Sequence, residues 1–198
     1  MSFAAGDVSP ELRAEFPALR LHFTALDARV RASSPDLRRR LRALSDRYRG
    51  AGVVAMRTQP IPHAYRAFFR QVGLDPDAAR IPSEEAAVRR LVQGRFRSLD
   101  SVQDALLIAL IETGVPVWAL DACAVDVASF GIRASPTGQL LVGDGSRVHA
   151  TLFGAPAPEH LPGPRTDRVV LFAVGVEGVP AIHLEEALWL AGEAIRAG

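Results

Sequence analysis

Residues 105–111 are apolar without exception, so a helix over this run has no polar face. The run belongs to the segment 101–113, which predicts a helix that ends where Gly114 and Pro116 break it. A helix that is apolar on all sides must be surrounded by other elements. We therefore expect a central, buried helix here, begun by a capping box in which Asp104 takes the place of the usual Glu opposite Ser101.

Helices are predicted before and after this run from their hydrophobic spacing. The segment 35–49 has an apolar stripe and a cationic outer face. The segments 62–72 and 83–93 follow, and Ser83 is expected to cap the second of them. A last helix is expected over 183–195.

Strands are predicted mainly in the second half of the chain. Residues 18–26 alternate between apolar and polar side chains, as in a half-buried strand. After Asp121, glycine and proline separate short strand-like pieces, which are 125–134, 138–143, 147–153 and 167–176. Helices early and strands late predict one α+β domain over 1–198, a central mostly antiparallel sheet flanked by helices.

Composition restricts the chemistry. All 23 basic residues of the 198-residue chain are Arg, so mechanisms that need a lysine are excluded. Residues 1–100 carry 18 Arg against 11 acidic residues, whereas 101–198 carry 5 Arg against 11. The basic half suits contact with a polyanion, but Arg on solvated helix faces explains it equally well.

Other features argue against membranes, metals and export. No apolar run reaches the ~18 residues that a membrane span needs, and no signal-peptide pattern opens the chain. The single cysteine, Cys123, cannot form an intramolecular disulfide, and the five histidines lack a metal-binding spacing. We expect a cytoplasmic protein without a metal, a cofactor or a membrane partner.

One segment resembles a known family. Residues 101–125 are similar to the B3/B4 editing domain of the phenylalanyl-tRNA synthetase beta subunit, in the order and spacing of Val102, Asp104, Gly114, Pro116, Val117, Ala119, Leu120 and Asp121. Residues 64–77 and 83–94 resemble the two helices of free-standing members, and 165–174 resembles the strand that closes the editing pocket. The similarity covers about residues 60–190, and residues 1–55 lie outside it.

The resemblance implies a B3/B4-like fold and an activity. A free-standing editing domain would act on aminoacylated tRNA and hydrolyse a wrongly made ester, because a synthetase pocket discriminates poorly between side chains of similar shape. The protein would then be an RNA-binding aminoacyl-tRNA deacylase that serves translation fidelity. It would not be a full synthetase.

The departures from the family change the expected pocket. Trp118 stands where the synthetase has a His, Phe172 where it has a Glu that reads the tyrosine hydroxyl, and Thr151 where it has a Gly. A site with these side chains cannot hydrogen-bond a phenol, so we expect an apolar pocket that does not accept Tyr. We expect Trp118 to form a wall of the pocket and Asp121 to hold the turn that positions it. Core packing explains Trp118 equally well, and a purely structural turn, in which backbone N–H groups satisfy the carboxylate, explains Asp121 better.

The expected catalytic residues are His149, Thr151 and Thr166, with His149 as the candidate base and the threonines orienting water. The terminal ribose hydroxyl of the tRNA can also assist hydrolysis. Phosphate contacts are expected from a set of arginines on three helices, namely Arg38, Arg39, Arg40, Arg42, Arg66, Arg70, Arg89 and Arg90. The alternative is a non-catalytic module of the same fold that binds RNA or an amino-acid-like ligand.

Overall fold

The computed structural model describes residues 1–48 and 56–198, and the strands in these ranges form two sheets. The first sheet has the order β1 (Ala4–Ala5), β3 (Arg20–Asp27), β8 (Arg168–Gly175), β4 (Val117–Asp121), and all its pairs are antiparallel. The second has the order β2 (Asp7–Val8), β5 (Gly131–Ala134), β6 (Leu140–Gly143), β7 (Val148–Thr151), and only β2 pairs in parallel. The predicted α+β class is confirmed, with the strands divided between two sheets.

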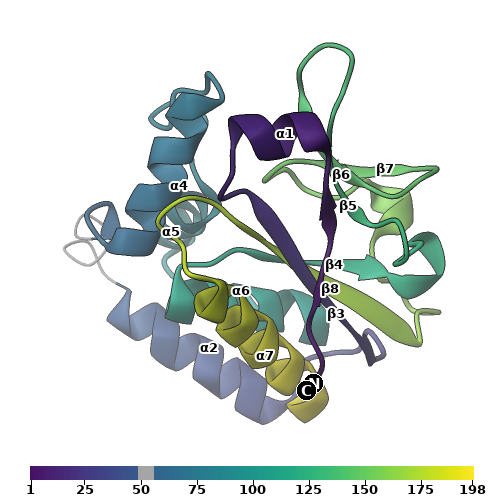
Figure 1. Cartoon of the computed structure of the whole chain (residues 1–198). Helices are drawn as coiled ribbons and strands as arrows, with labels where there is room; N and C mark the ends of the chain where they lie inside the picture. The colour runs from purple at the N-terminus through teal and green to yellow at the C-terminus, as the bar shows by residue number, and fades with distance from the viewer. Residues whose placement is uncertain (49–55) are drawn as a thin grey trace.

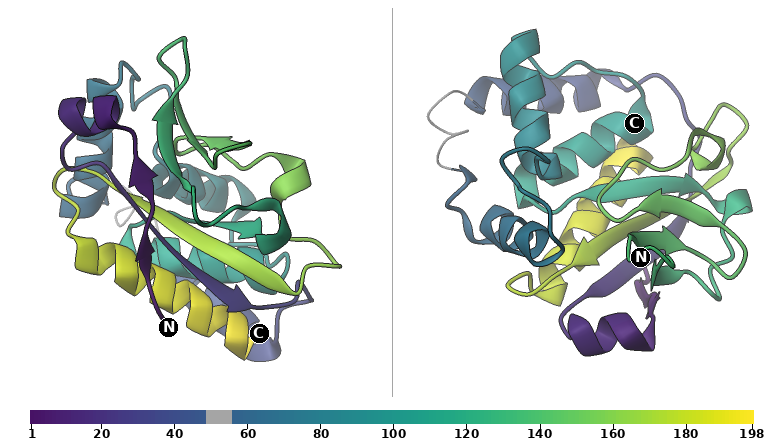
Figure 2. Two further views of the ribbon diagram at one scale, coloured as in Figure 1. Left: turned by 45° about the vertical axis from the view of Figure 1, so that its right-hand side comes forward. Right: turned by 90° about the horizontal axis from the view of Figure 1, so that it is seen from above.

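Helices cover one face of the first sheet, and the second sheet lies toward its other face (Figures 1 and 2). The covering layer consists of α7 (Ala181–Ala197) and α6 (Ser101–Thr113), with α2 (Pro35–Arg47) packed on both. The connected pair α4 (Pro60–Gln71) and α5 (Pro82–Gln93) stands at one end of this layer, and the short α1 (Pro10–Glu15) stands beside the second sheet. The N-terminal strands β1, β2 and β3 therefore lie in the same two sheets as the strands of the C-terminal half.

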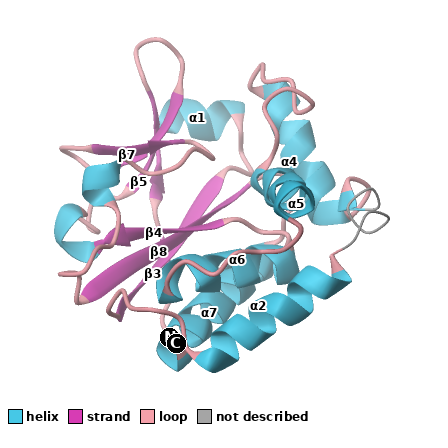
Figure 3. Ribbon diagram, turned by 180° about the vertical axis from the view of Figure 1, so that it is seen from behind, coloured by secondary structure: helices cyan, strands magenta, loops and turns pink. Residues whose placement is uncertain are grey.

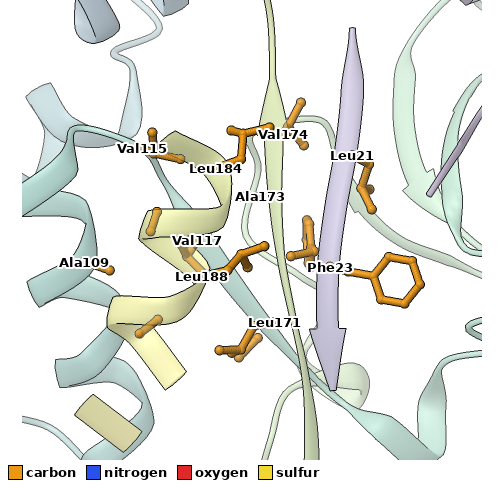
Figure 4. Close-up of a cluster of buried hydrophobic side chains, with 14 of the residues drawn as sticks. Leu21, Phe23, Ala109, Val115, Val117, Leu171, Ala173, Val174, Leu184 and Leu188 are labelled. Carbon is orange, nitrogen blue, oxygen red and sulfur yellow. The ribbon is translucent and has the colours of Figure 1, made fainter. Parts of the chain in front are cut away.

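The core lies between the helix layer and the first sheet (Figure 4). Leu184 and Leu188 of α7 point into it and meet β8, where Leu171 is also fully buried. Every residue of β8 after Arg168 is buried, because this strand has a neighbour on each side and a layer on each face. Truncation of a leucine at such a site to alanine costs about 2–5 kcal/mol.

The helix ends differ from two predictions. The cap of α6 is Asp100, whose carboxylate accepts hydrogen bonds from the backbone N–H groups of Val102 and Gln103, so the predicted capping box at Ser101 is one residue out of register. Helix α5 starts at Pro82 after Ile81, and Ser83 lies inside it, so the predicted Ser83 cap is wrong. The predicted helix 35–49 is α2, and its last residue, Arg49, lies outside the described ranges.

The central helix was predicted in the right place but is not enclosed on all sides. Ala105, Ile108 and Ala109 of α6 are fully buried. The opposite face of the same helix, with Leu106 and Leu107, is only half-buried. No helix in the described ranges has the length and apolar character that a membrane crossing requires.

Candidate functional site

Trp118 borders an open recess. It lies in β4 opposite Phe172 of β8, and the two rings stack with centroids 5.4 Å apart and planes 16° apart. Phe172 is fully buried behind it, whereas the indole is half-buried. The remaining surface of Trp118 faces a recess of about 590 Å³, a volume in the range of small-molecule sites.

The recess is bounded by α5, α6, β4 and the loop that follows β7, and Figure 3 shows α5 beside α6 at this side of the molecule. Its floor is apolar and includes Leu106, Leu107 and Leu110 of α6. Leu99, which is 70% exposed, stands at its edge. The face of α6 that meets no other element therefore forms the floor of the recess.

Phe153 supplies a second aromatic wall. Its ring lies 6.0 Å from that of Trp118 and also contacts the rings of Phe68 and Phe69 on α4. Phe153 has φ +62°, and it is the one non-glycine residue with positive φ in the described ranges. A bulky residue in this region is strained by roughly 1–3 kcal/mol, so the packing of its ring must hold the loop in place.

The predicted pocket and catalytic residues do not gather around this recess. Trp118 lines it, but Phe172 lies behind Trp118 in the core. Thr151 is exposed at the end of β7 and outside the lining. Thr166 is buried, and its hydroxyl donates to Asp121 while it accepts from the N–H of Gly163.

Asp121 holds a turn, as the sequence indicated. Its carboxylate accepts hydrogen bonds from the backbone N–H of Cys123 at 2.9 Å and from the Thr166 hydroxyl. Burial acts to raise the pKa of Asp121, but these hydrogen bonds outweigh it and hold the pKa below its ordinary value. The ionised carboxylate therefore ties the end of β4 to the loop before β8, and it is not part of the recess lining.

His149 belongs to a buried chain of hydrogen bonds. The side chain is fully buried, its Nε2 lies 3.0 Å from a carboxylate oxygen of Asp144, and its Nδ1 lies 3.1 Å from Nδ1 of His160. Both ring nitrogens of His149 are thus occupied, and the residue is outside the recess lining. His149 cannot act there as the base that the sequence suggested, because it has no free nitrogen.

The electrostatics of this chain follow from burial and hydrogen bonding. Burial lowers the pKa of His149, although its hydrogen bond to Asp144 acts in the opposite direction. Burial acts to raise the pKa of Asp144, but backbone N–H donors from Asp126 and Ser146 and the His149 ring lower it far more. At neutral pH the carboxylate is therefore ionised and His149 is neutral.

The predicted arginine set divides into several groups. Arg66 is buried and paired with Glu84 at 2.8 Å, so it cannot reach a phosphate without breaking that pair. The remaining members of the set are at least partly exposed. Four of them have protein partners: Arg39 pairs with Asp36, Arg40 with Glu112 and Arg89 with Glu85, and Arg90 donates to the Ser45 carbonyl.

Two of the predicted arginines, Arg89 and Arg90, line the recess, and Arg97 joins them there. Arg38 and Arg42 of α2 and Arg70 of α4 are exposed, and Arg70 acts through its charge on Asp77. The recess thus combines an apolar floor, an aromatic wall and an edge with guanidinium groups. This combination suits a ligand that carries both an apolar or flat group and an anionic group.

Sequence reasoning missed the floor leucines, Phe153 and His160. The signal for the leucines was present in the apolar run 105–111, which has more apolar faces than neighbouring elements cover. No comparable signal marks Phe153 or His160. Among the described residues there is no group of three or more side chains able to hold a metal ion.

Comparisons with known proteins add no relative. No model of a protein family matches the chain, and no curated protein matches its sequence significantly.

Proposed function

We propose that the protein is a free-standing relative of the B3/B4 editing domain, binds the aminoacylated end of a tRNA in the Trp118 recess and hydrolyses its ester. The observation that carries this proposal is the open recess of about 590 Å³ beside the half-buried face of Trp118. A half-buried aromatic side chain that borders an apolar hollow is suited to stacking on a base or an apolar side chain. Such stacking contributes about 1–3 kcal/mol per base.

The charge distribution fits an RNA ligand. Arg89, Arg90 and Arg97 line the recess, and Arg70 stands exposed on the neighbouring helix α4. Phosphates that follow the terminal adenosine would meet these guanidinium groups outside the apolar floor. The apolar floor favours esters of apolar amino acids, so Tyr-tRNA is expected to be a poor substrate.

The chemistry requires little from the protein. An aminoacyl ester is already activated, so a positioned water and stabilisation of the developing oxyanion are enough for hydrolysis. The ribose hydroxyl next to the ester can assist. The recess would hold the ester while water attacks from its open side.

A second function is favoured by the polar side chains of the lining. Asp104 accepts three hydrogen bonds, from the hydroxyls of Ser33 and Ser98 and the N–H of Leu99, and Glu85 is paired with Arg89. Within the lining neither carboxylate is unpaired, and the buried one already accepts three hydrogen bonds. A non-catalytic module that binds RNA or an amino-acid-like ligand at the same recess is therefore the alternative.

One pair of assays separates these functions. Purified protein is tested for hydrolysis of Val-, Leu-, Ile-, Phe- and Tyr-tRNA, and for binding of an amide-linked leucyl-adenosine that cannot be hydrolysed. The deacylase predicts accelerated release of an apolar amino acid, whereas the binding module predicts binding with no acceleration. Failure to bind either RNA or the analogue would refute both.

The matched variants are Trp118→Ala and Trp189→Ala. Trp189 is the other tryptophan of the chain, is 49% exposed on α7 and lies outside the lining. Trp118→Ala is expected to weaken binding of the analogue by about tenfold or more, through the lost stacking. Trp189→Ala is expected to leave it unchanged, and equal effects of the two variants would place the ligand elsewhere.

A further inference from the structure

A series of hydrogen bonds runs from a buried carboxylate to a half-buried imidazole. Asp144, 3% exposed, follows β6 and accepts backbone N–H donors from Asp126, Ser146 and Arg147 at 2.9–3.0 Å. Asp144 also accepts a hydrogen bond from the buried ring of His149, which in turn contacts His160. The chain ends at His160, whose Nε2 has no hydrogen-bond partner among the described residues.

The protonation pattern of this chain follows from its first member. An ionised carboxylate only accepts, so the Nε2 of His149 must carry the hydrogen that it donates to Asp144. The neutral ring of His149 then has its lone pair on Nδ1, and the Nδ1–H of His160 must donate to it. The lone pair of His160 is consequently on Nε2, the nitrogen that is free.

The opposite arrangement would make His149 a buried cation. If its Nδ1 donated to His160, both of its ring nitrogens would carry hydrogen, and burial lowers the pKa of His149. The arrangement with a free lone pair on His160 is therefore the stable one. The same network also tolerates protonation of His160 at Nε2, because its Nδ1–H continues to donate to His149.

His160 is not itself part of the recess lining, but it directly precedes a residue that is. His160 ends the short helix η2 (Pro158–His160), and the adjacent residue, Leu161, lines the recess together with Pro156. The N–H of Ala157 donates to the carbonyl of His149 at 2.8 Å, and the N–H of His160 donates to the carbonyl of Ala157 at 2.9 Å. The first of these backbone bonds already fastens the loop to β7, so the hydrogen bonds between the side chains are not needed to hold the loop in place.

We infer that His160 is the general base and acid of the deacylation proposed above, with His149 and Asp144 as residues that position it. This assignment depends on that proposed function. It moves the base from His149, where the sequence suggested it, to the ring that still has a free nitrogen. The substrate class is an aminoacyl ester whose carbonyl carbon stands at the edge of the recess beside Leu161.

The step balances in protons and bonds. A water oxygen bonds to the ester carbonyl carbon while one of its protons passes to Nε2 of His160. The tetrahedral adduct then collapses, the bond between carbon and ribose oxygen breaks, and Nε2 returns the proton to that oxygen. One water is consumed, the products are the free amino acid and uncharged tRNA, and nothing is oxidised or reduced.

The kinetic test uses the tRNA of the panel that the wild-type protein hydrolyses fastest. His160→Ala is expected to lower kcat by about 100-fold or more and to leave the affinity for amide-linked leucyl-adenosine unchanged. Added imidazole is expected to raise the rate of this variant. His63→Ala, at an exposed position of α4, is the matched control and is expected to retain full activity.

The outcomes separate this inference from the function on which it depends. If the wild type hydrolyses no member of the panel, the deacylase function fails and this inference fails with it. If the wild type is active and His160→Ala retains kcat within about twofold, only the assignment of His160 is overturned.

A spectroscopic measurement on the wild-type protein needs no variant. Long-range nitrogen–proton NMR correlations are expected to show the Nε2–H form of His149 and the Nδ1–H form of His160. An Nε2–H form of neutral His160 would overturn the inference. His149→Gln is expected to shift the nitrogen signals of His160 and to lower kcat with little change in KM, which a mere loop contact would not do.

Discussion

Arg66 and Arg70 stand one turn apart on α4 and are expected to behave oppositely when each is replaced by alanine. The Arg66 side chain is 8% exposed and its guanidinium lies 2.8 Å from a carboxylate oxygen of Glu84, which is 3% exposed. Arg70 is exposed. Arg66→Ala removes the main partner of a buried carboxylate, whereas Arg70→Ala removes only a solvated charge.

The magnitude follows from the burial of the pair. Loss of one partner of a buried ion pair costs about 3–5 kcal/mol, because the other charge stays buried. Glu84 keeps the half-exposed Arg57 at 3.0 Å, so we expect the lower end, about 3 kcal/mol. In a chain of this length that corresponds to a fall in Tm of roughly 6–12 °C. For Arg70→Ala we expect a change within about 0.5 kcal/mol.

The assay is urea denaturation of both variants, followed by far-ultraviolet circular dichroism, with RNA affinity measured at a temperature where both are folded. Arg66→Ala should lose stability and keep its RNA affinity, and Arg70→Ala should do the reverse. The double variant Arg66→Met, Glu84→Leu should be less destabilised than Arg66→Ala, since no charge is left uncompensated. A stability of Arg66→Ala within about 1 kcal/mol of wild type would refute the buried-pair reasoning.

Three further predictions concern the sheet contact, the buried histidine and the basic surface. Gly131→Ala should destabilise the protein by about 1–3 kcal/mol in thermal or urea unfolding, because an added Cβ would lie 2.2 Å from the carbonyl oxygen of Asp7. The control is Gly163→Ala, whose added Cβ meets open space and should change stability by less than about 1 kcal/mol. The pKa of His149 lies below its ordinary 6.5, so below that pH the unfolded chain binds a proton that the folded chain does not. Stability should therefore fall as the pH drops from 7 toward 5, less steeply in His149→Gln, and an unchanged slope in titrated unfolding curves would contradict this. RNA affinity should fall by about tenfold or more over roughly a fourfold rise in salt, and salt-independent binding would remove the arginines from the site.

Local patterns predicted most of the fold. The helix over 101–113 was marked by apolar residues inside and by Gly114 at its end, which adopts the left-handed conformation at φ +75°. The alternation in 18–26 predicted the strand β3, because that strand has one face on the core. These signals depend only on neighbours in the sequence.

Cap positions were harder to predict because several neighbouring residues had suitable side chains. Asp100 and Ser101 are both residue types that favour the N-cap position, and Asp100 occupies it. Ser83 had the right chemistry but lies within α5, where Pro82 occupies the first helical position. Capping chemistry therefore located the helix start to within one or two residues.

The site was less accessible to sequence reasoning because its partners are distant in the chain. Arg66 was expected to contact phosphate, but it is buried and pairs with Glu84, 18 residues away. The chain from Asp144 through His149 to His160 depends on the end of β6, on β7 and on the loop that follows it. Trp118, which a resemblance marked as a pocket wall, lines the recess, whereas Asp121, Thr151 and Phe172 lie outside its lining.

The most direct measurement is a fluorescence titration of the Trp189→Phe variant, in which Trp118 is the one remaining tryptophan. Amide-linked leucyl-adenosine is added and the emission of Trp118 is followed. If the ligand stacks in the recess, the emission changes saturably, and the same analogue binds Trp118→Ala at least tenfold more weakly by calorimetry. Emission that stays constant up to millimolar analogue, while RNA still binds, would contradict the central claim that this recess receives the aminoacyl end.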